Sequence, residues 1–137
     1  MTVRRATHAP TCFTLILCCL LLAGCGSGDG LAKVKGRVTL NGEPLEGAIV
    51  EFRPADPAGS SSSGETDAKG RYELRYTFAK HGAMPGEYVV AIRTAGTGFG
   101  DHDEEVERVE RVPAKYNSQT ALKRTVEPGR NTINFDL

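Results

Sequence analysis

Apolar and polar residues alternate in short runs from Leu31 to the C-terminus, and turn-forming residues separate the runs. Strict alternation over roughly four to eight residues is typical of a strand that buries one face. The sequence predicts strands over 33–40, 48–54, 71–76, 88–93, 122–126 and 132–137. The side chains predicted to face the core are those of Val34, Val38, Leu40, Val50, Phe52, Tyr72, Leu74, Tyr88, Val90, Ile92, Ile133 and Phe135. Because no long run has the period of a helix, we expect an all-β fold, an antiparallel, Greek-key-like β-sandwich.

Glycine, proline and asparagine mark the turns between these strands. Asn41-Gly42 is the strongest short signal for a hairpin. The segment 66–70 reads Thr-Asp-Ala-Lys-Gly and predicts a turn in which the aspartate accepts hydrogen bonds from nearby N–H groups. We interpret 55–64 as a loop, 94–100 as irregular and 101–111 as a solvated, charged segment.

The first 24 residues have the pattern of an export signal. Arg4 and Arg5 precede the apolar run Cys12–Ala23, which is shorter than the roughly 20 residues that a membrane-spanning helix needs. The run ends in Leu22-Ala23-Gly24-Cys25, which resembles the lipobox of bacterial lipoproteins. The alternatives are an ordinary signal peptide with a chance cysteine, or an uncleaved anchor.

The lipobox resemblance implies cleavage between Gly24 and Cys25 and attachment of diacylglycerol to the Cys25 thiol. The organisation expected is a signal peptide over 1–24, a flexible tether over 25–31 and a single domain over 32–137. The protein would then be held in the cell envelope by its N-terminal lipid, with the membrane as one partner. Gly26 follows the cysteine where an aspartate would indicate retention, so resemblance to Gram-negative sorting favours the outer membrane over the inner one.

The positions of the cysteines and the balance of charges argue against some kinds of site and partner. The other cysteines, Cys12, Cys18 and Cys19, lie inside the predicted leader, so we expect neither a disulfide nor a thiolate metal site in the domain. The 137 residues include 17 basic and 17 acidic side chains and no long basic block. This balance argues against nucleic acid as a partner.

Three segments carry a resemblance to a known family. Residues 36–52, 66–74 and 85–92 resemble the carboxypeptidase regulatory-like domain, which has a prealbumin-like sandwich. The segments 112–117 and 122–137 resemble the ending of short exported lipoproteins of planctomycete-type bacteria. The resemblance implies the fold, but it implies little about function, because nearly all matched residues are turn formers or core positions.

Candidate chemical residues are few. His81 and His102 lie in different predicted loops without the spacing of a zinc pair. The acidic run from Asp101 to Glu110 lacks the glycine-punctuated spacing of a calcium loop and contains interleaved arginines, so we interpret it as solvated, with cation binding left open. Ser60–Ser63 lacks the surroundings of a catalytic serine. We expect no catalytic residue, metal or cofactor.

Lys115, Tyr116 and Asn117 form the candidate contact surface, because they place an aromatic residue between two polar ones after Pro113. The alternative for Tyr116 is packing against the edge of the sandwich.

Three classes of function are compatible with the sandwich. The first is a non-catalytic, lipid-anchored envelope module that binds a protein or polysaccharide or has a structural role. The second is a transthyretin-like small-molecule hydrolase, whose Tyr-Arg-Gly-Ser-type ending is absent from 134–137. The third is an adhesin-like domain with an internal crosslink from Lys33 or Lys35 to Asn134, although alternation places both lysines on the outward face.

Overall fold

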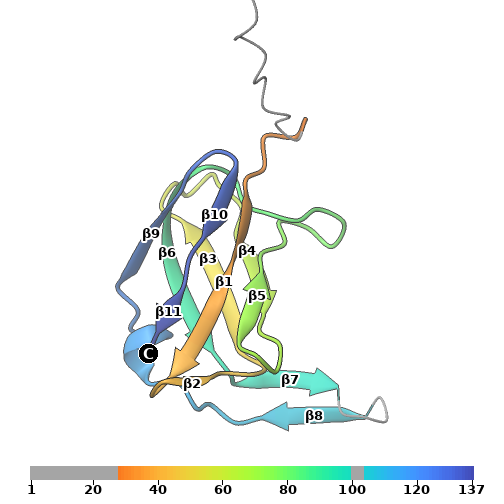
Figure 1. Cartoon of the computed structure of the whole chain (residues 1–137), viewed down its shortest axis with the longest axis vertical. Helices are drawn as coiled ribbons and strands as arrows, with labels where there is room; N and C mark the ends of the chain where they lie inside the picture. Colours follow the sequence, from red (N-terminus) through yellow and green to blue (C-terminus); the bar gives the residue numbers. More distant parts are fainter. Residues whose placement is uncertain (1–27, 100–103) are drawn as a thin grey trace, which may run out of the picture.

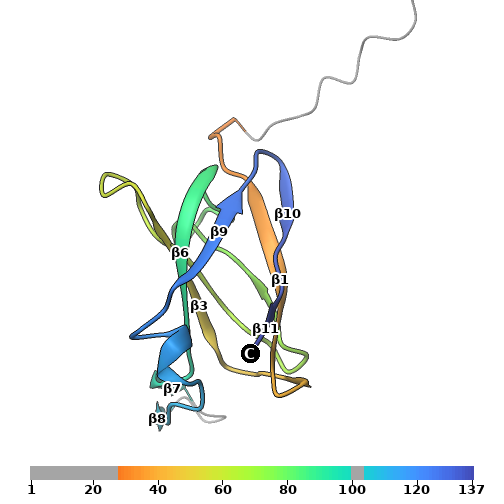
Figure 2. The ribbon, with the colours of Figure 1, turned by 90° about the vertical axis from the view of Figure 1, so that its left-hand side faces the viewer.

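The computed structural model describes residues 28–99 and 104–137, and in this part of the chain the fold is a β-sandwich (Figures 1 and 2). The predicted signal peptide, with Gly24 and Cys25, lies outside the described residues. The elements are β1 (Lys33–Leu40), β2 (Glu43–Pro44), β3 (Ile49–Pro54), β4 (Ser62–Glu65), β5 (Arg71–Glu73), β6 (Gly86–Arg93), β7 (Gly96–Phe99), β8 (Glu105–Arg108), the short 3₁₀ helix η1 (Ala114–Tyr116), β9 (Leu122–Val126), β10 (Arg130–Thr132) and β11 (Phe135–Asp136).

The two main sheets form the layers that Figure 2 shows side by side. The first sheet is built on β1, which pairs antiparallel with β2 and β5. The second sheet is fully antiparallel and has the strand order β4-β3-β6-β9. The predicted antiparallel sandwich is therefore confirmed, with one local exception. The C-terminal strands β10 and β11 pair with β1 in parallel, one after the other along its length.

The core lies between these layers and contains most of the residues that alternation predicts, together with others that it did not predict, such as Leu45, Ala83 and Val112. Val34, Val38, Val50, Phe52 and Ile92 are all buried. The aromatic rings of Phe52 and Phe135 connect the two sheets, with their centroids 6.2 Å apart. Within the second sheet, the Phe52 ring centroid lies 5.7 Å from that of Tyr88. Leu40 and Ile133, which were also predicted to face inward, are partly buried and pack against the same cluster.

The Asn41-Gly42 turn is confirmed as a hairpin turn. Both residues have positive φ, 52° and 84°, which is the geometry of the tight turn that favours this dipeptide. The hairpin closes on the two-residue strand β2, after which the chain crosses to the second sheet. The predicted turn at 66–70 is also confirmed, with the carboxylate of Asp67 accepting hydrogen bonds from the N–H groups of Lys69 and Arg71, both at 2.9 Å.

Three segments without a predicted strand contain strands in the structure. The end of the expected loop 55–64 belongs to β4, where Ser62 is buried opposite Phe52. The segments 94–100 and 101–111 contain β7 and β8, which form a two-stranded antiparallel ribbon. Conversely, the strand predicted over 71–76 ends at Glu73, after which Arg75 makes only isolated bridges to Ser63 and His81.

The sandwich has two distinct ends. The chain enters β1 at the end that is uppermost in Figure 1, which we call the entry end. The β7–β8 ribbon, η1 and the C-terminus lie at the opposite end, which we call the far end (Figure 1). Ordered packing starts at Leu31, which is buried, and at Ala32, whose N–H and carbonyl both bond to Ala83.

Candidate functional site

A polar groove lies on the outer face of the second sheet, between the strands and η1. Its volume is about 240 Å³. The lining residues, which together we call the sheet groove, are Arg53, Ala91, Arg93, Glu110, Asn117 and Ser118. Strand alternation explains the arginines, because the neighbouring residues Phe52 and Ile92 point into the core. The helix η1 packs against β6, and the residues that follow it, Asn117 and Ser118, form one side of the groove.

Two guanidinium groups of the sheet groove share one carboxylate. Glu51 Oε2 lies 2.8 Å from Nη2 of Arg53 and 3.2 Å from Nη1 of Arg93. The pKa of Glu51 is lowered, chiefly by the hydrogen bond and charge of Arg53, against a smaller opposing effect of burial. Each guanidinium has five N–H donors. Arg53 and Arg93 therefore keep donors that an acceptor in the groove could use.

Glu110 joins the ribbon to the body of the domain. Its carboxylate accepts hydrogen bonds from the backbone N–H groups of Thr94 at 3.0 Å, Ala95 at 3.4 Å and Val112 at 2.9 Å. Burial acts to raise the pKa of Glu110, but these hydrogen bonds outweigh burial and lower it. The buried Thr94 hydroxyl adds to the junction by accepting from the N–H of Arg111 at 2.7 Å. Glu110 thus has a structural role at the edge of the groove.

The predicted contact residues Lys115, Tyr116 and Asn117 have separate environments. Tyr116 is partly buried against the core, and Nζ of Lys115 lies 4.7 Å from its ring centroid. The side-chain amide of Asn117 donates to the carbonyls of Val112 at 3.0 Å and Pro113 at 3.3 Å. Of the three, Asn117 also contributes to the wall of the sheet groove.

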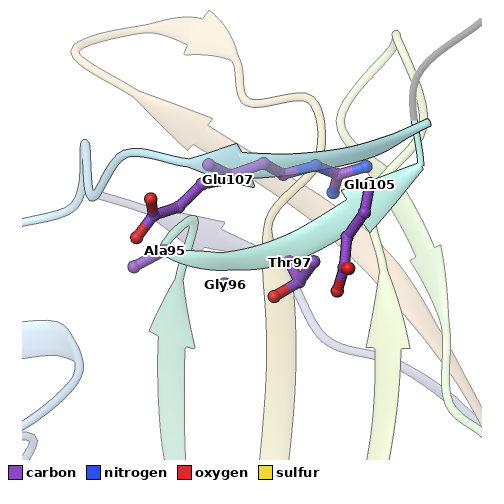
Figure 3. Close-up of a pocket in the computed structure, with 6 residues that line it drawn as sticks. Ala95, Gly96, Thr97, Glu105 and Glu107 are labelled. Carbon is purple, nitrogen blue, oxygen red and sulfur yellow. The ribbon is translucent and has the colours of Figure 1, made fainter.

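A second depression, which we call the ribbon groove, follows the β7–β8 ribbon. It is open and encloses about 430 Å³. Its lining residues are Ala95, Gly96, Thr97, Glu105, Glu107 and Arg108. Figure 3 shows Thr97 between the carboxylates of Glu105 and Glu107. Arg108 forms an ion pair with Glu65 of β4, which holds the ribbon against the second sheet.

The described residues include some of the side chains that could bind a metal or transfer a proton. Across 28–99 and 104–137, no group of three or more histidine, cysteine, aspartate or glutamate side chains is placed to hold a metal ion. His81 is half-exposed on a loop, 3.7 Å from Glu73. His102, with Asp101 and Asp103 of the acidic run, lies outside the described residues.

The serine run and the crosslink candidates are also located. Ser60 and Ser61 are exposed, Ser62 is buried in β4, and Ser63 bonds through its backbone to Arg75. Lys33 and Lys35 are exposed on β1, as alternation predicts. The Asn134 side chain accepts a hydrogen bond from the backbone N–H of Arg37 at 3.0 Å.

Sequence reasoning missed the sheet groove. Alternation correctly marks Glu51, Arg53 and Arg93 as outward-facing. It does not reveal that β3 and β6 pair with Glu51 opposite Ala91, which brings the three charges together. For Glu110, no sequence signal distinguishes it from the other glutamates of the charged segment.

In the part of the chain that the structure describes, no helix is long and apolar enough to cross a membrane. No family model and no curated protein matches the chain.

Three solved structures are distantly similar to this chain. A 9R-lipoxygenase from Cyanothece has 19% identity and a TM-score of 0.44 over 80% of this chain, which spans 17% of the lipoxygenase. A DUF3823 family protein from Parabacteroides merdae has 17% identity and a TM-score of 0.41 over 77% of this chain and 44% of its own. A candidate carbohydrate binding protein from Pseudomonas aeruginosa has 12% identity and a TM-score of 0.44 over 79% of this chain and 89% of its own. These likenesses assign the chain to no family.

Proposed function

We propose that this protein is a non-catalytic, lipid-anchored module of the bacterial cell envelope that binds a polysaccharide in the sheet groove. The observation that carries the binding role is the cluster of Arg53 and Arg93 around Glu51, next to the exposed Ser118. Sugar hydroxyls both donate and accept hydrogen bonds. The groove offers guanidinium donors from Arg53 and Arg93, and the hydroxyl of Ser118 can donate and accept.

The lining favours a polysaccharide over a protein partner. Protein interfaces usually have a desolvated centre that is rich in aromatic and other apolar side chains. The apolar residue of the sheet groove is Ala91, which is only 1% exposed. A ligand in this groove would therefore exchange polar contacts with charged side chains and bury little apolar surface.

The anchor rests on Leu22-Ala23-Gly24-Cys25 and on the position of the entry end. The chain enters β1 at one end of the sandwich, and η1, which borders the sheet groove, lies at the other (Figure 1). An acylated Cys25 would hold the entry end close to the membrane and leave the η1 side of the groove facing away from it.

The non-catalytic role is supported by the state of the groove carboxylates. Catalysis by general acid or base requires a group whose pKa lies near the working pH. The pKa values of Glu51 and Glu110 are both lowered, and both carboxylates are occupied by structural hydrogen bonds. Their environments keep them ionised at neutral pH.

Binding is tested by screening the detergent-solubilised protein on a glycan array and measuring the strongest ligand by calorimetry. Loss of a hydrogen bond to a charged group costs about 1.5–3 kcal/mol, so Arg93→Ala should weaken binding roughly tenfold or more. Lys69→Ala is the matched control, because it removes one cation from an exposed turn outside the groove. Absence of any glycan ligand, or equal affinity in both variants, would contradict the polysaccharide role.

The non-catalytic role is tested with esterase, ureide-hydrolase and glycosidase substrates. We expect no turnover by the protein. Turnover that disappears in the double variant His81→Ala, His102→Ala would overturn this part of the proposal.

A further inference from the structure

Phe78 is an unusually exposed aromatic residue near the entry end. The residue is 94% exposed, compared with 79% for Val109 and 43% for Met84. It lies in the turn 76–80 between β5 and β6, which projects sideways from the upper half of the domain in Figure 1. We call this segment the Phe78 turn. Single exposed apolar residues are common. What distinguishes Phe78 is how its turn is held and where the turn lies.

The Phe78 turn is closed by its own hydrogen bonds. The backbone N–H of Tyr76 donates to the carbonyl of Lys80 at 2.8 Å. In return, the backbone N–H of Lys80 contacts the hydroxyl of Thr77 at 3.1 Å. Phe78 is therefore presented at the tip of a structured turn, and little ordering would be needed for it to bind.

The turn is also fastened to the point where the N-terminal segment joins the domain. Ala32 and Ala83 exchange two backbone hydrogen bonds, of 2.8 and 2.9 Å. The approach is close, since a Cβ on Gly82 would lie 2.3 Å from the carbonyl oxygen of Ala32. Nζ of Lys80 lies 3.8 Å from a carboxylate oxygen of Asp29. Any tether on the N-terminal side therefore leads directly to the base of the Phe78 turn.

The distance to an anchor at Cys25 is short. Six residue steps separate Cys25 from the buried Leu31, and a fully extended chain spans at most about 3.6 Å per residue, or roughly 20 Å in total. A lipid on Cys25 would keep the turn within a short distance of the bilayer. Linkage of this kind gives even a weak second contact a high effective concentration.

The apolar and basic side chains near Phe78 favour contact with a phospholipid surface. Met84, which is 43% exposed, follows the same connection before β6, and Gly30 packs near it. Arg75 and Lys80 flank the turn with positive charge. Aromatic and apolar side chains flanked by cations favour the boundary between headgroups and acyl chains, particularly where anionic lipids are present.

We propose that the Phe78 turn inserts its aromatic side chain into the surface of the bilayer that carries acylated Cys25, and so fixes the orientation of the domain. This inference rests on the proposed lipid anchor. It assigns the turn a phospholipid ligand and makes the domain lean toward the membrane on the side of the β5–β6 connection.

The absence of tryptophan from the sequence allows a direct test. The variant Phe78→Trp places a fluorescent reporter in the turn. Val109→Trp is the matched control, because Val109 is 79% exposed and follows β8 at the far end. Both full-length proteins, acylated in cells, are reconstituted into vesicles of phosphatidylethanolamine and phosphatidylglycerol, with and without brominated acyl chains.

For Phe78→Trp we expect a blue-shifted emission, quenching by the brominated lipid and protection from aqueous iodide. For Val109→Trp we expect water-like emission and full iodide quenching. Equal iodide quenching of the two vesicle-bound proteins would overturn the inference and leave the anchor intact. Protection from iodide without quenching by brominated lipid would indicate a protein contact and would also overturn it. If neither protein remains with the vesicles, the lipid anchor itself fails.

Discussion

Gly36 lies where β1 leaves no room for a side chain. A Cβ at this position would be 1.8 Å from the carbonyl oxygen of Ile133 and 3.0 Å from the ring of Tyr72. The Tyr72 hydroxyl also donates to that carbonyl at 2.7 Å. One hydrogen atom in place of a methyl group thus allows the C-terminal strands to lie against β1.

We predict that Gly36→Ala destabilises the domain by about 3 kcal/mol, the upper part of the usual range for overpacking, because the obstructing atoms belong to the backbone. Urea unfolding measures the change. Gly28→Ala is the control, since a Cβ there meets nothing within 4 Å. Equal unfolding midpoints for the two variants would show that the C-terminal strands do not pack as described.

Phe135 is the aromatic residue through which the last strand enters the core. It is 2% exposed and lies between the rings of Phe52 and Tyr72. Phe135→Ala should lower the free energy of unfolding by roughly 3–5 kcal/mol through lost burial and the cavity left behind. Phe78→Ala removes the same side chain from an exposed position and should leave the melting midpoint in solution unchanged. A similar effect of both substitutions would refute this core assignment.

At the scale of elements, the β7–β8 ribbon depends on its junction with β6 and the segment before η1. Glu110 accepts backbone hydrogen bonds from both sides of that junction, from Thr94 and Ala95 after β6 and from Val112 before η1. The Arg108–Glu65 ion pair is a second attachment, but it is partly exposed, and exposed pairs contribute little.

Glu110→Ala should therefore loosen the ribbon more than it loosens the sandwich. Removing the shared acceptor costs about 1–3 kcal/mol locally. Hydrogen exchange should accelerate at the amides of Thr94, Ala95 and Val112, while the amides of β3 and the centre of β6 keep their protection. The control Glu107→Ala removes an exposed carboxylate of the ribbon itself. Uniformly faster exchange across the whole domain would contradict a local role.

The same carboxylate makes the junction sensitive to acid. Folding lowers the pKa of Glu110 below its ordinary value of 4.5, so the folded state favours the ionised form. Its contribution to stability is full above pH 4.5 and is lost as the pH falls through the depressed folded pKa. The difference in unfolding free energy between the wild type and Glu110→Ala should be constant from neutral pH to about 5 and should shrink below 4.5. A difference that grows on acidification would reverse the assigned sign.

Sequence pattern predicted the elements whose packing depends on their own apolar residues. The strands β1, β3 and β6 alternate strictly, and their inward residues are buried. By contrast, β4 reads Ser-Ser-Gly-Glu and β7 reads Gly-Thr-Gly-Phe, compositions typical of loops. These strands form because neighbours pair with them, and at Gly64 a Cβ would lie 2.4 Å from the carbonyl oxygen of Glu73. The sheet groove was hidden for the same reason, since strand pairing decides which outward charges meet.

In the molecule as a whole, the two ends of the sandwich have different proposed roles. The entry end receives the segment that leads from Cys25 and carries the Phe78 turn. The far end carries η1 and the ribbon, which border the two grooves (Figure 1). Anchoring at one end and binding toward the other would let a small domain reach a ligand in the envelope without blocking its own site.

Both the proposed anchor and the proposed orientation depend on a lipid at Cys25, which mass spectrometry of the N-terminal peptide from membrane-extracted protein can detect. We predict a peptide that begins at Cys25 and carries a diacylglycerol group on the thiol, with fatty acid on the amine where the cell adds it. Cys25→Ser should abolish both the modification and the membrane association. An unmodified Cys25, or a peptide that retains residues of 1–24, would contradict the account.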